Sequence, residues 1–346
     1  MSMNDNDLFA DAAHDVLADR CTPAVVRAIE CGGRAADAAR GLWEQLESTG
    51  LADALLGEDE GGAGLELDQA FGVLEQCGAH ALPLPLAETM VARALLAQAG
   101  LVRPQGSIAL ARGQRGAGGG LHCALVRGGQ VADTVLVQAG GAWHLLPVDG
   151  AHAHAHALAL DAALTWSAAQ CDAASTVAVD AALDVRTLQA AVVAAQMAGA
   201  LSSVFQRTLR YANERQQFGR PIGKFQAVQH QLAVMSEHVF AARMAAQLGC
   251  SGGGVGIQPD RLRVATAKAR CSEAALAVSE AAHAIHGAIG FTEEHDLQLF
   301  TRRLHAWRQT AGSEGYWHTV AGEALLQHSG ITLDLVRRIT DVEFPA

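Results

Sequence analysis

Lysine is nearly missing from the sequence, and runs of basic residues do not occur. Lys224 and Lys268 are its two lysines, and acidic residues outnumber Lys plus Arg by 36 to 25, giving a formal net charge of −11. Nucleic acids and anionic lipids are bound by clustered cations that neutralise phosphate groups. The composition therefore argues against a nucleic-acid partner.

Cysteine pairs with the spacing of a metal site or a disulfide framework are also missing. The seven cysteines are scattered, and no CxxC pair occurs; they stand at positions 21, 31, 77, 123, 171, 250 and 271. An odd number of cysteines without regular spacing is typical of reduced thiols in a cytosolic protein. We expect a cytoplasmic protein without a bound metal.

A secretory signal and a membrane span are not expected either. The first residues, MSMNDNDLFADAAHDV, are acidic and lack the positively charged and apolar regions of a signal peptide. The most apolar long stretch, residues 188–205, is rich in alanine and is interrupted by glutamine and serine. We predict that it is a buried helix and that the chain does not insert into a membrane.

Aromatic residues make up only 5% of the chain, although 50% of the residues are hydrophobic. A core with so few aromatic side chains favours helices that pack closely through small residues. At the start of the chain, apolar residues such as Leu8, Ala12 and Val16 recur at helical steps. We predict an N-terminal helical domain over residues 1–104, including a helix that starts near residue 65.

The segment 105–180 has a different pattern. Short apolar runs are separated there by clusters of glycine, aspartate and histidine. Such runs, bounded by turn residues, predict the strands of a small antiparallel unit, the middle β domain. Its AHAHAH tract at 151–156 is predicted to be a surface loop rather than a metal site, with the histidines on opposite faces of an extended chain.

Long helices are predicted in the last segment, residues 181–346. The first covers 184–214 and ends there because the following Gly-Arg-Pro sequence cannot continue a helix. Further helices are expected over 225–248, from the N-cap Asp260 to the C-terminal Gly287, from Thr292 onward, and over 313–327. Four or five adjacent helices form a bundle, so the predicted fold class is α+β.

A motif after the first long helix of the bundle points to a family. Residues 210–229, RYANERQQFGRPIGKFQAVQ, closely resemble the acyl-CoA dehydrogenase signature RxQFGxPIxxFQxxQ. Residues 55–64, LLGEDEGGAG, resemble the PExxGGxG loop of that family, and residues 286–292, HGAIGFT, resemble its HGGxGFT loop. The resemblance covers essentially the whole chain and implies an acyl-CoA dehydrogenase-like fold with a reduced middle β domain.

The resemblance implies that FAD is the cofactor and suggests how this chain contacts it. In the family, the residues that match Arg215, Gln217 and Phe218 reach the FAD of a neighbouring subunit. A guanidinium suits the pyrophosphate because it donates two parallel charge-assisted hydrogen bonds, and the ring of Phe218 can cover the adenosine. Gly287 and Gly290 let the backbone approach the same cofactor.

The roles of other residues near these motifs are less closely defined by the resemblance. Phe225 and Gln226 are expected to be cofactor-site residues that act through packing and support. His286 either contacts the cofactor or packs beneath it. For the corner itself the alternative is structural, with Arg215 only capping its helix and Phe218 lying in the core.

Neither position at which the family places its catalytic base holds a carboxylate. Family chemistry removes the α-proton of an acyl-CoA thioester with a glutamate while a hydride passes from the β-carbon to the flavin. The Glu-Gly-Thr turn of the family is matched by Ala-Gly-Ser at 311–313, and the alternative position falls at about Gln189. Glu314 could substitute only if this turn were rearranged; otherwise it is a first-turn helix carboxylate.

The flavin cradle also departs from the family pattern. Ala284 replaces the glutamine before the HGGxGF loop, Ala288 replaces a glycine within it, and the β region lacks a TEPxxGSD-like stretch. The sequence thus keeps the corner residues that contact the FAD of a neighbouring subunit. It lacks much of the cradle that would bind an FAD of its own.

These features predict the small, base-lacking subunit of a heteromeric FAD-dependent acyl-CoA dehydrogenase. A larger subunit would supply the Glu base, in an α2β2 heterotetramer that acts on a bulky acyl-CoA such as a steroid side-chain thioester. The resemblance implies an electron-transfer flavoprotein as the electron acceptor. The alternatives are a self-sufficient homo-oligomeric dehydrogenase that uses Glu314, and a non-enzymatic scaffold or binding protein of the same fold.

Overall fold

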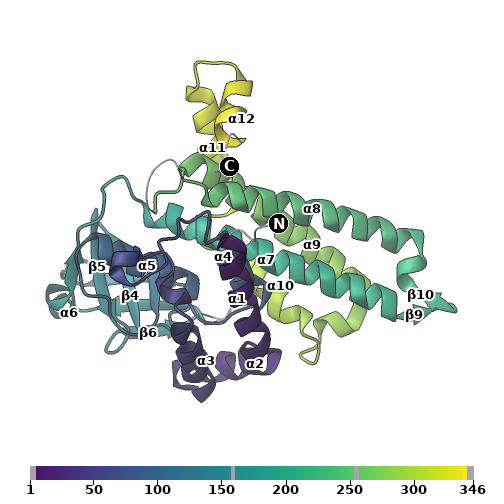
Figure 1. Cartoon of the computed structure of the whole chain (residues 1–346), viewed down its shortest axis with the longest axis horizontal. Helices are drawn as coiled ribbons and strands as arrows, with labels where there is room; N and C mark the ends of the chain where they lie inside the picture. Colours follow the sequence, from purple (N-terminus) through teal and green to yellow (C-terminus); the bar gives the residue numbers. More distant parts are fainter. Residues whose placement is uncertain (1–4, 157–159, 253–256, 341–346) are drawn as a thin grey trace.

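The computed structural model describes residues 5–156, 160–252 and 257–340. Helices come first in the chain, strands follow, and the last part is helical again (Figure 1). This order agrees with the predicted α+β class. The N-terminal helices are α1 (Asp5–Arg20), α2 (Pro23–Gly32), α3 (Asp37–Ser48), α4 (Phe71–Ala79) and α5 (Leu86–Gln98).

The middle of the chain contains two four-stranded sheets that share one hydrophobic core. The strand order is β1-β4-β5-β8 in one sheet and β2-β3-β7-β6 in the other. A short helix, α6, precedes the last strand. The bounds are β1 (Ile108–Arg112), β2 (Gln114–Arg115), β3 (Leu121–Val126), β4 (Thr134–Ala139), β5 (Ala142–Pro147), β6 (His152–Ala155), β7 (Ala162–Trp166), α6 (Ala168–Ala173) and β8 (Ser175–Val177).

The prediction of a purely antiparallel unit is wrong at one pair of strands. Strands β1 and β4 run parallel, with Ile108 opposite Thr134. After β1 the chain crosses into the second sheet and forms β2 and β3 before it returns as β4. A parallel pair requires such a crossover, which no local pattern in the sequence reveals.

The histidine tract is a strand, so the prediction of a loop is also wrong. Strand β6 pairs antiparallel with β7 at the edge of its sheet, and its side chains are exposed. The prediction that the histidines lie on opposite faces is wrong as well. The rings of His152 and His154 lie 4.7 Å apart, because residues two apart on a strand point to the same face. Over the described residues, no cluster of three His, Cys, Asp or Glu side chains could hold a metal ion.

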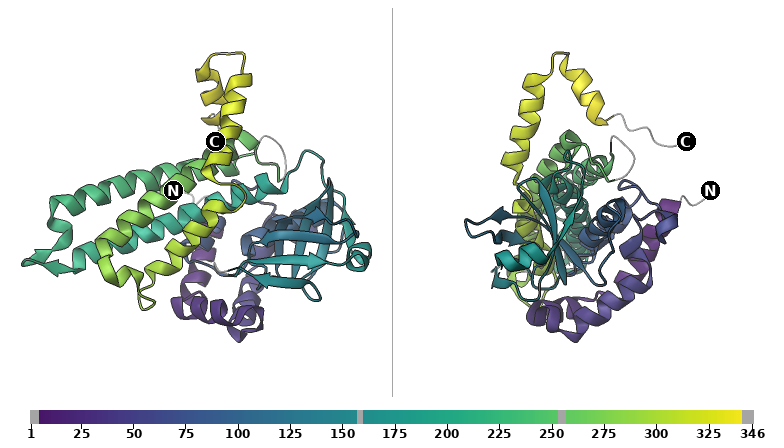
Figure 2. Two further views of the ribbon diagram at one scale, coloured as in Figure 1. Left: turned by 180° about the vertical axis from the view of Figure 1, so that it is seen from behind. Right: turned by 90° about the vertical axis from the view of Figure 1, so that its left-hand side faces the viewer.

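The C-terminal part is a helical bundle with a hairpin of two further helices. A two-stranded ribbon follows the first helix, and α11 and α12 project away from the bundle (Figures 1 and 2). The elements are α7 (Val185–Glu214), β9 (Gln216–Gln217), β10 (Arg220–Pro221), α8 (Gln226–Cys250), α9 (Arg261–His286), α10 (Leu297–Gln309), α11 (Glu314–Gln327) and α12 (Thr332–Thr340).

The ends of α9 agree with the sequence-based prediction. The side chain of Asp260 accepts hydrogen bonds from the amides of Leu262 and Arg263 at the N-terminus. Gly287, with φ 65°, follows the last helical residue. Both ends depend on local chemistry alone, a carboxylate N-cap and a glycine that tolerates positive φ, which explains why they could be predicted.

Helix α10 begins at Leu297 and not at Thr292, as the sequence suggested. Arg27 of α2 donates hydrogen bonds to the carbonyl oxygen of Glu293 at 3.0 Å and to a carboxylate oxygen of Asp296 at 2.9 Å. These bonds come from a segment more than 250 residues earlier in the chain. They hold residues 293–296 in a turn and delay the helix.

Helix α4 begins at Phe71 and not near residue 65. The side-chain oxygen of Gln69 accepts from the amide of Glu66, and the carboxylate of Asp68 accepts from the amide of Gln69, both at 2.8 Å. Such local bonds compete with the helical hydrogen bonds and favour a turn.

The core joins the two helical parts through close contact between α4 and α7. A Cβ atom on Gly199 would lie 1.9 Å from the carbonyl oxygen of Glu75, and one on Gly78 would lie 1.7 Å from that of Gln196. One hydrophobic core runs through the N-terminal helices, the bundle and one face of a sheet. The division into three domains at residues 104/105 and 180/181 stays a prediction.

One described helix, α7, has the length and composition of a membrane span. The apolar 18-residue window of this helix has a mean hydropathy of 1.5, and 83% of it is buried inside the protein. A core helix of a globular protein has the same composition, so this feature alone is weak evidence for a membrane.

The close approach of α4 and α7 predicts that Gly199→Ala is destabilising. The added methyl group would force two backbones apart, and overpacking of this kind costs about 1–3 kcal/mol in the free energy of unfolding. The control is Gly322→Ala in α11, where a Cβ meets nothing within 4 Å. There we expect stabilisation of up to about 1 kcal/mol from helix propensity. Urea denaturation measures both effects, and equal effects of the two variants would contradict this explanation.

Candidate functional site

The RxQFG segment forms an exposed corner where α7 ends. Arg215 follows the last residue of the helix, and β9 and β10 then make a tight antiparallel ribbon. Phe218, at the tip of this ribbon, has φ 52° and is 92% exposed. The alternative that Phe218 is a core residue is therefore wrong.

The side chain of Arg215 is also exposed, so its guanidinium is available to bind a ligand. Its backbone caps α7 through a hydrogen bond from its amide to the carbonyl of Tyr211 at 2.8 Å. In the described parts of the chain, no side chain pairs with this guanidinium. Gln217 lies beside it on β9 with an exposed side chain.

Phe225 and Gln226 lie where the corner leads into α8. The guanidinium of Arg220 stacks over the ring of Phe225 at 4.2 Å, and the ring of Phe218 stands edge-on to it at 6.2 Å. Phe225 thus supports the two outward-facing side chains, whereas Gln226 is exposed as the first residue of α8. A cation over an aromatic face is stabilising and orients the corner.

Tyr211 brings the corner and the HGAIGFT loop to the same end of the bundle. Its ring stacks on His286 with centroids 4.4 Å apart, and its hydroxyl donates to the carbonyl oxygen of His286 at 3.3 Å. Tyr211 is one turn of α7 before Arg215, so the two motifs are neighbours although about 70 residues separate them. Tyr211 was not among the predicted site residues, although it lies inside the 210–229 motif.

His286 is a buried, neutral histidine with one unused nitrogen. Its Nδ1 bonds to the carbonyl oxygen of Ala282 at 2.8 Å, and its Nε2 is buried without a hydrogen-bond partner among the described residues. Burial lowers the pKa of His286, opposed by the bond to Ala282. With Nδ1 as the donor, Nε2 is an acceptor that can receive a hydrogen bond from a bound molecule.

The glycines of the loop have different roles. Gly287 is exposed at positive φ, and a Cβ there would meet nothing within 4 Å. Gly290 is buried, and a Cβ there would lie 3.0 Å from Cβ of His286 and 3.3 Å from Nδ1 of His283. Gly290 is therefore required for packing, while Gly287 is suited to close approach by a ligand.

These groups suit a flavin nucleotide. The corner offers an exposed aromatic face and an exposed guanidinium, and the loop offers an unused buried acceptor. Phe291, a residue of the HGAIGFT motif that was not among the predicted site residues, is 72% exposed and borders a cavity of about 910 Å³ together with Gly290. A cavity of this size is in the range of small-molecule and cofactor sites.

The turn at the family's base position is held by a lysine instead of carrying a carboxylate. Ala311 and Gly312 have φ of 57° and 105°. The fully buried Nζ of Lys268 donates to the carbonyl oxygens of Arg308 and Gly312, at 3.0 and 2.9 Å, and to the hydroxyl of Ser272 at 3.0 Å. In its ammonium form this side chain complements the free carbonyl oxygens at the end of α10 and in the turn that follows it.

Gln189 and Glu314 do not fit the role of a general base either. The side chain of Gln189 donates to the carbonyl oxygen of Leu110 at 2.7 Å and fastens α7 to the sheet. Glu314 forms an ion pair with Arg308, which approaches it through Nε at 3.0 Å and through Nη2. This hydrogen bond lowers the pKa of Glu314, whereas a carbon-acid base needs a desolvated, more basic carboxylate.

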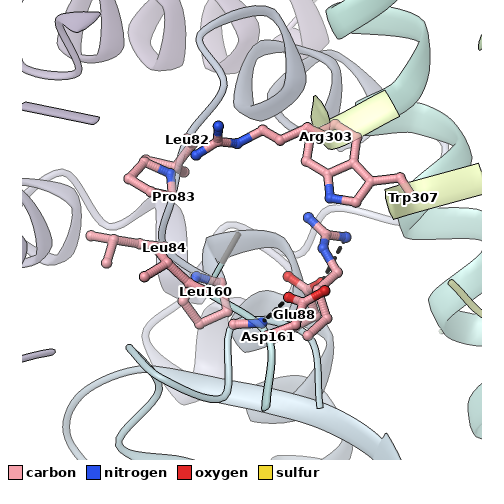
Figure 3. Close-up of a pocket in the computed structure, with 11 residues that line it drawn as sticks. Leu82, Pro83, Leu84, Glu88, Leu160, Asp161, Arg303 and Trp307 are labelled. Carbon is pink, nitrogen blue, oxygen red and sulfur yellow. Dashed lines mark hydrogen bonds and ion pairs between the residues drawn. The ribbon is translucent and has the colours of Figure 1, made fainter. Parts of the chain in front are cut away.

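A small cavity beside α10 is lined by charged and apolar side chains, which surround it in Figure 3. It measures about 30 Å³, room for about one water molecule, and lies between α5, the sheets and α10. Glu88 and Arg127 pair across it at 2.9 Å, and Arg127 stacks over Trp307 at 4.7 Å. This junction has no room for an acyl chain.

The PExxGGxG-like loop at 55–64 is held in place by contacts within this chain. The amide of Gly64 donates to the carbonyl oxygen of Leu56 at 2.6 Å, and Arg103 pairs with Glu60. A Cβ on Gly62 would lie 2.3 Å from the carbonyl oxygen of Leu56. The glycines of this loop are explained by its own tight turn.

The role of Lys268 predicts a pH-dependent contribution to stability. Burial lowers the pKa of Lys268 to about 7, while an unfolded lysine titrates at about 10.4. Between these values the unfolded chain binds more protons, so this residue makes folding more favourable as pH rises. From pH 7 to about pH 9, we expect the free energy of unfolding of the wild type to increase relative to that of Lys268→Met.

Urea denaturation at several pH values measures this difference. Lys224→Met, at the chain's other lysine, is the matched control because the side chain of Lys224 is exposed. Parallel pH curves for the wild type and Lys268→Met would contradict the prediction.

Comparison with known proteins gives consistent matches. A family model described as acyl-CoA dehydrogenase, C-terminal domain, matches residues 179–326. The acyl-CoA dehydrogenase IpdE2 of Mycobacterium tuberculosis is 30% identical over 303 residues, covering 87% of this chain and 91% of that protein.

Solved structures have the same fold. A chain of the ChsE4-ChsE5 complex from Mycobacterium tuberculosis superposes with a TM-score of 0.82 at 23% identity, covering 95% of this chain and 99% of that one. A chain of the Tcur3481-Tcur3483 steroid ACAD superposes with a TM-score of 0.76 at 25% identity, covering 93% and 98%. Taken with the nearly full-length relative, these matches establish that the chain belongs to the acyl-CoA dehydrogenase family of FAD-dependent flavoenzymes.

Proposed function

We propose that this chain is the small subunit of a heteromeric acyl-CoA dehydrogenase, in which a larger subunit supplies the glutamate base. The observation that carries the proposal is the contrast between two places in the chain. The turn at 311–313 has a buried lysine beneath it and no carboxylate, and Glu314 is bound to Arg308. The corner at 215–218, by contrast, presents the side chains of Arg215 and Phe218 outward to solvent.

In this role the corner contacts FAD held mostly by the partner. Arg215 would bind the pyrophosphate, Phe218 would cover the adenosine, and Gln217 would add a polar contact. When bound, FAD supplies the two-electron acceptor for the α,β-dehydrogenation of the thioester. Phe225 and Gln226 position the corner.

The HGAIGFT loop would complete the contact. Nε2 of His286 would accept a hydrogen bond from the bound molecule, since it has no partner among the described residues. Gly287 would allow backbone contact, and Gly290 keeps His286 in place through its packing. These side chains bind and orient the cofactor; none of them moves a proton of the substrate.

The relatives support a proposal for the partner and for the substrate class. ChsE4-ChsE5 is a complex of two different chains, and Tcur3481-Tcur3483 is named as a steroid ACAD. By this similarity we propose an α2β2 heterotetramer that acts on a bulky acyl-CoA of the steroid side-chain type. An electron-transfer flavoprotein would accept the electrons, and the location would be the cytoplasm.

The two alternatives have less support. A homo-oligomeric enzyme that uses Glu314 needs this carboxylate to leave Arg308 and to gain basicity, against the bond that lowers its pKa. A scaffold without FAD gives no reason for an exposed Phe218 held by Phe225 and Arg220 at a strained, positive φ.

We expect Arg215→Ala in the co-purified complex to weaken FAD binding. Loss of one charge-assisted hydrogen bond costs about 1.5–3 kcal/mol, which is roughly 10- to 100-fold in the dissociation constant. Fluorescence titration of the apo-complex with FAD measures it. The control is Arg40→Ala, at an exposed arginine of α3 that pairs with Asp37. Unchanged affinity in the Arg215 variant would reject the assignment of the corner.

The division of labour predicts that the chain purified alone is colourless and that the complex with a longer homologue is yellow. The visible spectrum of the purified proteins tests this prediction. Stoichiometric FAD on the chain alone would support the homo-oligomeric enzyme, and a colourless complex would support the scaffold.

The same division of labour predicts that Glu314→Gln leaves the turnover of the complex within about two-fold of the wild type, since Glu314 is not the base. A dye-reduction assay of the complex measures this turnover.

A further inference from the structure

A second cavity, separate from the corner, lies between the N-terminal helices and the bundle. It measures about 450 Å³, which is large enough for a small organic ligand. Helices α1, α4, α7 and α10 and the start of α2 form its walls. The side chains that give the wall its chemical character are His14, Gln76, His80, Arg207, Arg210 and Phe300.

The wall of this cavity is basic, although the chain is acidic. Two arginines and two histidines line it, and no carboxylate is among its described lining residues. The chain as a whole has a formal net charge of −11. The wall of the cavity of about 910 Å³ beside Phe291, by contrast, does contain carboxylates, because Glu30, Glu293 and Glu294 are part of its lining. A wall without acids in an acidic protein favours an anionic ligand.

The positive charge is concentrated on one face of α7. Arg207 and Arg210 are three residues apart, so their side chains are neighbours on the helix surface. Burial and the nearby charge of Arg210 lower the pKa of Arg207, while Asp296 opposes this. Asp296 compensates only in part, because its carboxylate is 3.6 Å from Arg207 and also binds Arg27 at 2.9 Å.

Arg210 adds an uncompensated charge. Its side chain is exposed, and no ion pair is made to it within the described parts of the chain. A ligand anion placed between Arg207 and Arg210 would remove the repulsion between them. It would also provide charge-assisted hydrogen bonds to both guanidinium groups.

Polar and apolar groups complete the wall. Nε2 of His80 lies 3.3 Å from Nδ1 of His14, which lies 3.2 Å from the side-chain oxygen of Gln76. Burial of His80, together with His14 and Arg207 nearby, lowers the pKa of His80 to about 4, so its ring is neutral at neutral pH. Phe300 lies under Arg207 and adds an apolar surface, with the guanidinium 4.7 Å above its ring.

We propose that this cavity binds a small organic anion, a carboxylate or a phosphate ester. Its acidic group lies between Arg207 and Arg210, and its body contacts Phe300 and the polar His14–His80 pair. This site is separate from the flavin corner, since none of the cavity's described lining residues belongs to 215–226 or to 286–291.

Isothermal titration calorimetry of the full chain, in about 0.15 M salt to suppress weak surface binding, tests the proposal. The probes are inorganic phosphate, hexanoate and phenyl phosphate, which separate a free anion, a carboxylate with an apolar body and a phosphate ester without the adenosine that the corner is proposed to bind. We expect at least one probe to bind with a dissociation constant below roughly 10 mM. Arg210→Gln and Arg207→Gln should each weaken it by about ten-fold or more.

Arg215→Gln is the matched control, because it makes the same substitution on an exposed arginine just past the end of the same helix. It should leave anion binding unchanged, and Arg210→Gln should in turn leave FAD binding by the complex unchanged. Because Arg210 is exposed, its variant should fold normally, which circular dichroism checks. Binding by no probe, equal binding by Arg210→Gln and the wild type, or loss in Arg215→Gln instead would overturn the proposal. Binding of an acidic peptide without any of the small anions would overturn it as well.

Discussion

The close packing of α7 is the constraint on which the rest of the structure depends. Its first half is buried on all sides and consists largely of small residues, so that α4 can approach until the backbones at Gly78 and Gly199 nearly touch. Its second half leaves the core and carries Tyr211 and Arg215 to the end of the bundle. One rigid helix therefore joins the N-terminal part, the sheet and the corner, and sets the position of the corner relative to all of them.

The charged side chains near the expected base positions are each held by hydrogen-bond or ion-pair partners. Abstraction of a proton from carbon requires a desolvated carboxylate with a suitable pKa. Glu88 is paired with Arg127, Glu314 is paired with Arg308, and Lys268 lies beneath the 308–312 turn. The uncompensated positive groups face outward or line a cavity. The electrostatics of this chain thus favours the binding of anions over proton abstraction.

Local patterns predicted the fold class and much of the helical structure. The bounds of α7 and α9 agree with the structure, because the Asp184 and Asp260 caps and the Gly287 terminus act within a few residues. Predictions failed where distant residues intervene, as at the start of α10, or where pairing is non-local, as in the parallel β1–β4 pair. The strand at 152–155 was missed because a histidine–alanine repeat carries little strand propensity of its own.

The sequence by itself determined the family, because the motif at 210–229 is specific, and it determined that the two expected base positions hold no carboxylate. Only the tertiary structure decided what the candidate residues can do. It placed Phe218 in solvent instead of the core, joined Tyr211 to His286, and bound Glu314 to Arg308. The physical reason is that exposure, stacking and ion pairing depend on which distant segments meet, whereas residue identity at a motif position does not.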